Sequence, residues 1–83
     1  MSVEITVNEH EEGKLKQQVF SVQQEDVDGL VLSEWLSSIL EDVASSLVTL
    51  EDIEVPLETP MTDLLLKGPS ITLNVLFFFI VDH

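Results

Sequence analysis

The segment SITLNVLFFFIV, residues 70–81, decides how the rest of the chain is arranged, because it is the strongest predicted β-strand. Every second residue along it is apolar and forms one face. On the other face Thr72 and Asn74 are polar, but the second half, from Leu76 to Ile80, is apolar as well. A strand that is apolar on both faces is usually covered on both faces. We therefore expect either a central strand with cover above and below, or a strand that contacts another molecule.

Two further strands are predicted near the N-terminus. Val3, Ile5 and Val7 alternate with polar residues, which indicates a strand with one apolar face. Residues 10–13 then form a turn that ends on a glycine. Residues 15–22 form a second strand, so the two are expected to make an antiparallel hairpin with an acidic tip.

The middle of the chain predicts one amphipathic helix over about residues 33–47. Ser33 stands at the N-cap position, and Glu34 lies in the first turn, where a negative charge is favourable. Trp35 is expected at the edge of the helix, packed against a sheet. The apolar positions with helical spacing are Leu32, Leu36, Ile39, Leu40, Val43 and Leu47.

Between this helix and the last strand the pattern is less regular. Residues 49–57 allow two interpretations, a short turn of helix or an extended segment that Pro56 restricts to the edge of a sheet. Thr59 and Pro60 have the form of an N-cap followed by a first helical residue. They predict a short helix over residues 61–67, which Gly-Pro then stops.

The order of these elements predicts an α+β fold for a single compact domain over residues 1–83. It is a small two-layer domain, with a mostly antiparallel sheet of three to four strands, one main amphipathic helix and a second short helix. A ubiquitin-like, or β-grasp, arrangement is one of the folds that this order allows. The chain lacks the terminal Gly-Gly that the ubiquitin-like carrier proteins use.

Charge is the strongest functional signal in the sequence. Sixteen Asp and Glu residues stand against three Lys and no Arg, a formal net charge of -13. Such a chain repels nucleic acid and anionic lipid, so neither is expected as a direct partner. The surface carries roughly one net charge per 400 Å² by the area-mass scaling. B-DNA carries about one per 100 Å², so imitation of DNA requires acids gathered on one face.

The sequence favours a cytoplasmic location. The chain has no cysteine, and it begins without the basic and apolar regions of a secretion signal. Its longest apolar run, residues 75–81, is far shorter than the roughly 20 residues that span a bilayer. We therefore expect no membrane contact.

No set of residues predicts catalysis, so we expect a protein that is not an enzyme. His10 lies near the hairpin tip and His83 ends the chain, and both are expected to be solvated. Residues 26–29 contain part of a calcium-loop pattern, but the remaining oxygen ligands are not at the required spacing. We predict no catalytic residue, no cofactor and no metal site.

The acidic residues are the candidate partner-binding site, because solubility alone is satisfied by a smaller net charge of mixed sign. In size and charge the chain resembles small phage-encoded anti-defence proteins and the immunity proteins of nuclease toxins. The hypothesis is an inhibitor or antagonist of a basic, nucleic-acid-handling protein, with carboxylates in the place of substrate phosphates. The alternative is a structural or adaptor protein that forms homo-oligomers through the C-terminal strand and the helix. The candidate residues are Glu9, Glu11 and Glu12 at the hairpin tip, Glu25, Asp26 and Asp28 before the helix, and Glu34, Glu41 and Asp42 on it.

Overall fold

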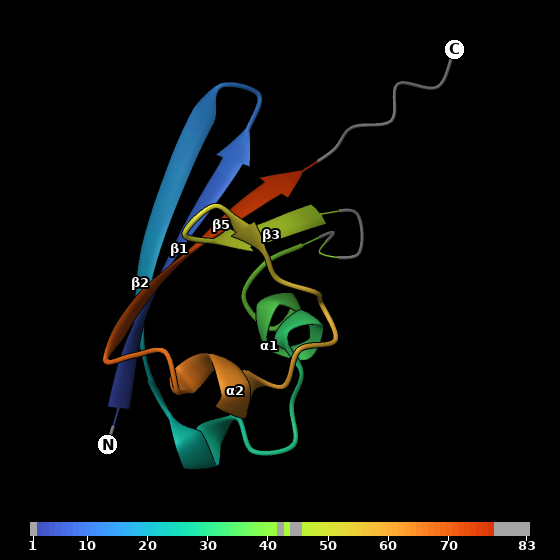
Figure 1. Cartoon of the computed structure of the whole chain (residues 1–83). Helices are drawn as coiled ribbons and strands as arrows, with labels where there is room; N and C mark the ends of the chain where they lie inside the picture. The colour runs from blue at the N-terminus through green and yellow to red at the C-terminus, as the bar shows by residue number, and fades with distance from the viewer. Residues whose placement is uncertain (1, 42, 44–45, 78–83) are drawn as a thin grey trace.

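A computed structural model describes residues 2–41, 43 and 46–77, which form a five-stranded sheet with two short α-helices against one of its faces (Figure 1). The strand order is β2-β1-β5-β3-β4. The strands are β1 (Ser2–Glu11), β2 (Lys14–Gln23), β3 (Ser46–Leu50), β4 (Ile53–Glu54) and β5 (Ser70–Phe77). The helices are the 3-10 helix η1 (Gln24–Asp26), α1 (Leu32–Ser37) and α2 (Met61–Leu65).

The predicted sheet of three to four mostly antiparallel strands is wrong. The sheet has five strands and is mixed, because β1 and β5 run parallel at its centre, while the other neighbours are antiparallel. Ile5 and Val7 of β1 lie beside Ile71 and Leu73 of β5, and all four are buried. The two strands that contribute the most buried side chains therefore pair with each other although they lie at opposite ends of the chain. This strand order, with a parallel central pair, is that of a ubiquitin-like, or β-grasp, sheet.

The helix predicted over residues 33–47 is also wrong in its extent, because α1 has only six residues. It ends just before Ser38, whose hydroxyl donates a hydrogen bond to the carbonyl of Trp35 at 2.5 Å. A serine that bonds to the backbone in this way offers the last carbonyls of a helix another partner and competes with its continuation.

The second half of the predicted helix contributes a strand instead. Leu47 and Val48 belong to β3, and Val48 is buried. Leu40 and Val43 are buried in the core as well. The apolar spacing therefore identified Leu32, Leu36, Leu40 and Val43 as core residues correctly, but only the first two lie in the helix. It was wrong at Leu47, because the buried residue of β3 is its neighbour Val48.

The starts of both helices differ from the prediction by one or two residues. Val31, not Ser33, is the N-cap of α1. Pro60, expected as the first residue of the second helix, is instead the N-cap of α2. Thr59 thus lies one position before the cap, and α2 ends at Leu65 rather than at residue 67.

Two tight turns connect neighbouring strands, and residues with positive φ form both. Glu12 and Gly13, with φ of 50° and 77°, join β1 to β2. Glu51 and Asp52, with φ of 51° and 67°, join β3 to β4. A two-residue turn of this kind matches the twist of the strands that it connects. Of the two interpretations of residues 49–57, the extended one therefore holds.

The core fills the space between one face of the sheet and the helices. Trp35 of α1 packs edge-on against Phe20 of β2, with ring centroids 5.5 Å apart, which confirms the predicted contact with the sheet. In β5, Leu73 and Val75 point into this core, while Leu76 lies partly exposed on the other face. Residues 78–81, the part of the predicted strand that is apolar on both faces, lie outside the described residues. The described helices include none that is long and apolar enough to cross a membrane.

Leu36 tests this core. Its side chain is fully buried in α1, whereas Leu66, just after α2, is 84% exposed. We expect Leu36→Ala to lower the free energy of unfolding by about 2–5 kcal/mol, through lost burial and the cavity left behind. Urea denaturation followed by tryptophan fluorescence measures the change. Leu66→Ala is the matched control, and an equal loss in the two variants would contradict this core.

Candidate functional site

The first predicted cluster, at the hairpin tip, is not purely acidic. Glu9 lies directly opposite Lys16, and Glu11 lies directly opposite Lys14. Opposite charges in such cross-strand positions attract each other. One carboxylate oxygen of Glu9 is buried and has no hydrogen-bond partner among the described residues. The tip therefore presents mixed charge, with Glu11 and Glu12 as its exposed acids.

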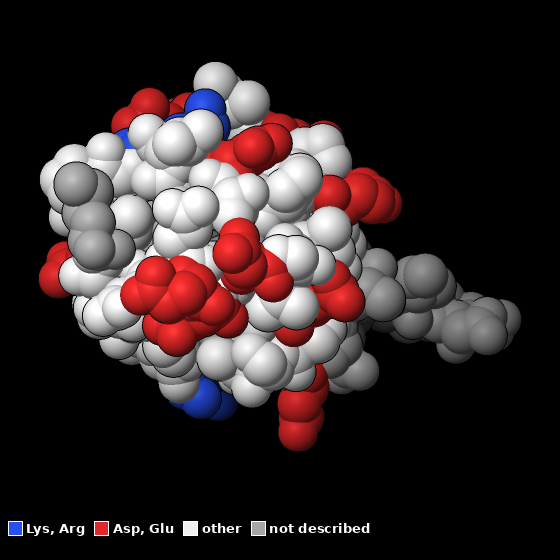
Figure 2. Space-filling view, turned by 90° about the horizontal axis from the view of Figure 1, so that it is seen from below, with Lys and Arg blue, Asp and Glu red and all other residues white. Residues whose placement is uncertain are grey.

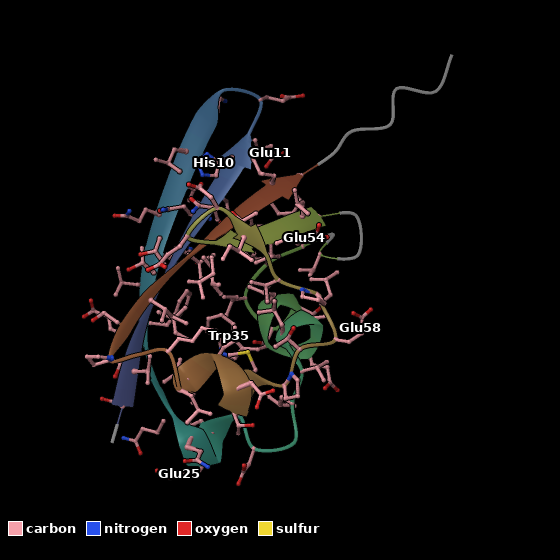
Figure 3. The ribbon with its side chains drawn as sticks, viewed as in Figure 1. His10, Glu11, Glu25, Trp35, Glu54 and Glu58 are labelled. Atoms are coloured by element: carbon pink, nitrogen blue, oxygen red, sulfur yellow. The ribbon has the colours of Figure 1, made fainter. Side chains whose placement is uncertain are left out.

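The second cluster lies at the opposite end of the molecule. Glu25, Asp26 and Asp28 follow the end of β2, whose ten residues separate them from the tip. At about 3.3 Å per residue, the two ends of such a strand are roughly 30 Å apart. Figure 3 shows this separation through the labelled Glu11 and Glu25. The two predicted clusters thus do not form one surface.

A short contact between two loops brings further acids to the second cluster. Val31 and Pro60, at the starts of α1 and α2, form an isolated antiparallel bridge. Beside it, the Leu32 N–H donates to the Thr59 carbonyl at 2.8 Å, and the Met61 N–H donates to the Leu30 carbonyl at 2.9 Å. The segment that precedes α1 is therefore held against the segment that precedes α2.

This contact defines a surface that we call the acidic face. It combines three predicted residues before α1, one predicted residue in α1, and two residues that the sequence did not single out as binding residues, Glu58 and Asp63. All of them are exposed. No sequence pattern places these two residues with the other four, because the bridge between the helix starts is what brings them together. The acidic face consists of Glu25, Asp26, Asp28, Glu34, Glu58 and Asp63.

The acidic face carries charge of one sign. Residues 24–41 and 55–66, which supply all of its acids, contain no lysine. Figure 2 shows the carboxylates gathered on this side of the molecule, with uncharged side chains between them and lysines only at the rim. A potential of one sign over such a surface attracts groups of the opposite charge.

Two of the six carboxylates also stabilise local structure. A Glu34 oxygen accepts a hydrogen bond from the Val31 N–H at 2.9 Å, and an Asp26 oxygen accepts one from the Gln23 N–H at 3.3 Å. Each satisfies a backbone donor at the start of a helix. The other four carboxylates make no side-chain hydrogen bond within the part of the chain that the structure describes, so they are available to a partner.

The third predicted cluster is not formed as expected. Glu41 is exposed but lies beyond the end of α1, because the helix stops at Ser37. Glu34 belongs to the acidic face instead. Asp42 lies outside the described residues.

The histidine near the tip is not simply solvated. His10 is half-buried, and its Nε2 lies 3.0 Å from Oδ1 of Asn74, which accepts the hydrogen bond. Asn8 donates to the same oxygen at 3.4 Å, and Gln17 donates to Asn8 at 2.9 Å. These side chains connect β2, β1 and β5 on the face of the sheet without helices. His10 therefore has a structural role there.

No metal centre is formed by the described residues, since no three His, Asp or Glu side chains among them are placed to hold one ion. In the segment that contains part of a calcium-loop pattern, Val27 is buried in the core and Gly29 takes a φ of 82°. A turn ahead of α1 accounts for this segment.

Comparison of the chain with protein-family models and with curated proteins found no match. The structure therefore defines the protein by its physical class. It is a small α+β domain with a β-grasp sheet, a mixed-charge hairpin tip and, at the other end, an exposed acidic face.

Glu34 separates the structural role of a carboxylate from its charge. We expect Glu34→Ala to lower the free energy of unfolding by about 1 kcal/mol, because the Val31 N–H loses its acceptor. Glu34→Gln keeps a side-chain acceptor and should retain most of that stability. Thermal unfolding followed by circular dichroism measures both variants. Equal destabilisation by both would show that charge, rather than the hydrogen bond, is what stabilises the start of α1.

Proposed function

We propose that this protein is a non-enzymatic binding protein that inhibits or antagonises a basic, nucleic-acid-handling protein through its acidic face. One observation carries the proposal. Six exposed carboxylates come together from two separate segments, and neither segment contains a basic residue. Solubility requires neither this concentration of charge nor its single sign.

The arrangement of the acidic face supports binding with only a small loss of conformational entropy. The hydrogen bonds beside the Val31–Pro60 bridge hold the starts of α1 and α2 together, and both helices are anchored by buried side chains, Leu36 and Leu64 among them. A preformed surface loses less conformational entropy on association than a mobile one. The carboxylates would thus occupy positions that the phosphates of a nucleic acid take on the partner.

The charge distribution also sets the direction of approach. Lys14 and Lys16 lie on the hairpin, at the end of the molecule away from Glu25. These lysines offset most of the charge of the acids at the tip, whereas the acidic face has no such compensation, so a basic partner is expected to meet the acidic face first. Association steered in this way is fast at low salt and falls steeply as ionic strength rises.

Assembly through the C-terminal strand and the helix, the alternative function, receives less support. β5 is hydrogen-bonded to β1 on one side and to β3 on the other over most of its described length. The apolar residues of α1, Leu32, Trp35 and Leu36, are buried in the core. The described parts of both elements are thus already used within the domain.

A charge-reversal experiment tests the proposed function. Asp28→Lys/Glu58→Lys reverses two acids of the acidic face that make no hydrogen bond within the described residues. We expect a basic protein captured from a cell lysate by the native chain to be released by DNA or by high salt. We also expect the variant to associate with the purified captured protein at least about ten-fold more slowly at low salt.

Glu4→Lys/Glu54→Lys is the matched control, since it changes the net charge equally at two exposed strand residues outside the acidic face. Surface plasmon resonance compares the three chains at two salt concentrations. Equal slowing by both variants would mean that only net charge matters. Capture that DNA does not affect would exclude a nucleic-acid-handling surface as the target.

A further inference from the structure

One edge of the sheet is open along a long strand. Within the described residues β2 pairs only with β1, so its other edge carries unpaired backbone groups. The turn at Glu12 and Gly13 is bracketed by Glu11 and Lys14, which face each other as its closing pair. In such a turn the Lys14 N–H points toward β1. Along β2 the N–H and C=O groups of successive residues then point alternately toward β1 and away from it. The residues that direct N–H and C=O to the open edge are therefore Leu15, Gln17, Val19, Ser21 and Gln23, all of them exposed. Of these groups, only the Gln23 N–H already has a partner among the described residues, a carboxylate oxygen of Asp26.

This open edge lacks the features that usually prevent pairing with another chain. Proteins protect long edge strands with charges, proline or bulges. Here eight consecutive residues, 17–24, contain no charge and no proline. The two lysines of β2, Lys14 and Lys16, lie near one end, and their side chains belong to the face that carries Phe20, not to the face of Val19.

The edge also differs in charge from the rest of the protein. β2 contains two of the three lysines and no acid. Glu25 and Asp26 follow directly after its other end. A strand that is positive at one end and followed by acids at the other is complementary to itself in the antiparallel direction. A basic partner is repelled by these lysines, whereas a second copy of this acidic chain is not.

We infer that β2 pairs antiparallel with β2 of a second copy, around a two-fold axis at Val19. In this register Val19 faces Val19 of the second copy, Gln17 faces Ser21, and Leu15 faces Gln23. Because these residues are symmetric about Val19, the outward N–H and C=O groups of Gln17, Val19 and Ser21 then all find partners. At each end the Leu15 N–H meets the Gln23 C=O, while the Gln23 N–H stays with Asp26. The result is one continuous sheet with an isologous interface.

Side chains support the same register. Val19 is 57% exposed, and it becomes covered by its own symmetry mate at the axis. Lys14 comes opposite Gln24 of the second copy, next to Glu25 and Asp26. Each end of the interface therefore places lysines beside carboxylates, which offsets part of the repulsion between two chains of like net charge. This inference does not depend on the proposed function.

A proline at the axis tests the backbone pairing. The Val19 N–H points away from β1, so Val19→Pro removes no hydrogen bond within the domain. Both symmetry-related N–H groups are lost from the interface, so we expect the dissociation constant of the dimer to rise at least about ten-fold. Sedimentation velocity over a concentration series measures it. Val19→Thr keeps the N–H and should keep the dimer, and circular dichroism verifies that both variants are folded.

Two outcomes of this experiment would overturn the inference. One is a native chain that stays monomeric at every concentration up to the millimolar range. The other is a dimer whose dissociation constant is the same in Val19→Pro as in the native chain, because such a dimer uses another surface.

A pair of charge variants tests the antiparallel direction. Lys14→Glu/Lys16→Glu makes both ends of the interface acidic, and Gln24→Lys/Glu25→Lys makes both ends basic, while Asp26 keeps its hydrogen bond. Each variant alone should form a weaker homodimer than the native chain. Mixed together they should form a heterodimer at least about ten-fold tighter than either homodimer. A mixture that associates no better than its components would rule out this register.

Discussion

The parallel pairing of β1 with β5 is the constraint on which the rest of the structure depends. Ile5 and Val7 of β1 and Leu73 and Val75 of β5 have no exposed surface, and these two strands form the centre of the sheet. Parallel neighbours cannot be joined by a tight turn, so the chain between them must cross over one face of the sheet. Both α-helices belong to this crossing, which explains why they cover one face and leave the other to His10 and Asn74.

The same crossing determines where the negative charge gathers. The two segments that precede α1 and α2 are far apart in the sequence, yet they meet at the Val31–Pro60 bridge. Short helices leave a large share of their backbone N–H groups without partners, and acids near their starts are favourable. Glu34 and Asp63 lie in the first turns of α1 and α2. Local stability accounts for acids at these two positions, but not for Asp28 and Glu58, which lie in the connecting loops.

The sequence predicted the local features well and the non-local ones poorly. Val3, Ile5 and Val7 are buried, as their alternation with polar residues predicted. This prediction succeeded because a period of two residues can be recognised from neighbouring residues alone. The residues around Leu47 fit a helical spacing and a short strand equally well, and pairing with β5 decided for the strand. Asp63 joins the acidic face only through the contact between two loops, and no periodicity indicates such a contact.

The open edge of β2 and the acidic face belong to the same small domain, so their relative positions link the two inferences about binding. Directly opposite residues of paired strands share a face. Pairing through β2 would therefore place the helices of both copies on the same side of one sheet. Because the two strands run antiparallel, the two acidic faces would lie at opposite ends of this sheet, related by the axis at Val19. Each acidic face would thus bind a partner separately, and a partner with two linked basic sites would gain effective concentration only if its linker spans both ends of the dimer. The lysines of β2 would lie beside Glu25 and Asp26 of the other copy, so Asp28, Glu34, Glu58 and Asp63 would be the acids of each face left to a basic partner.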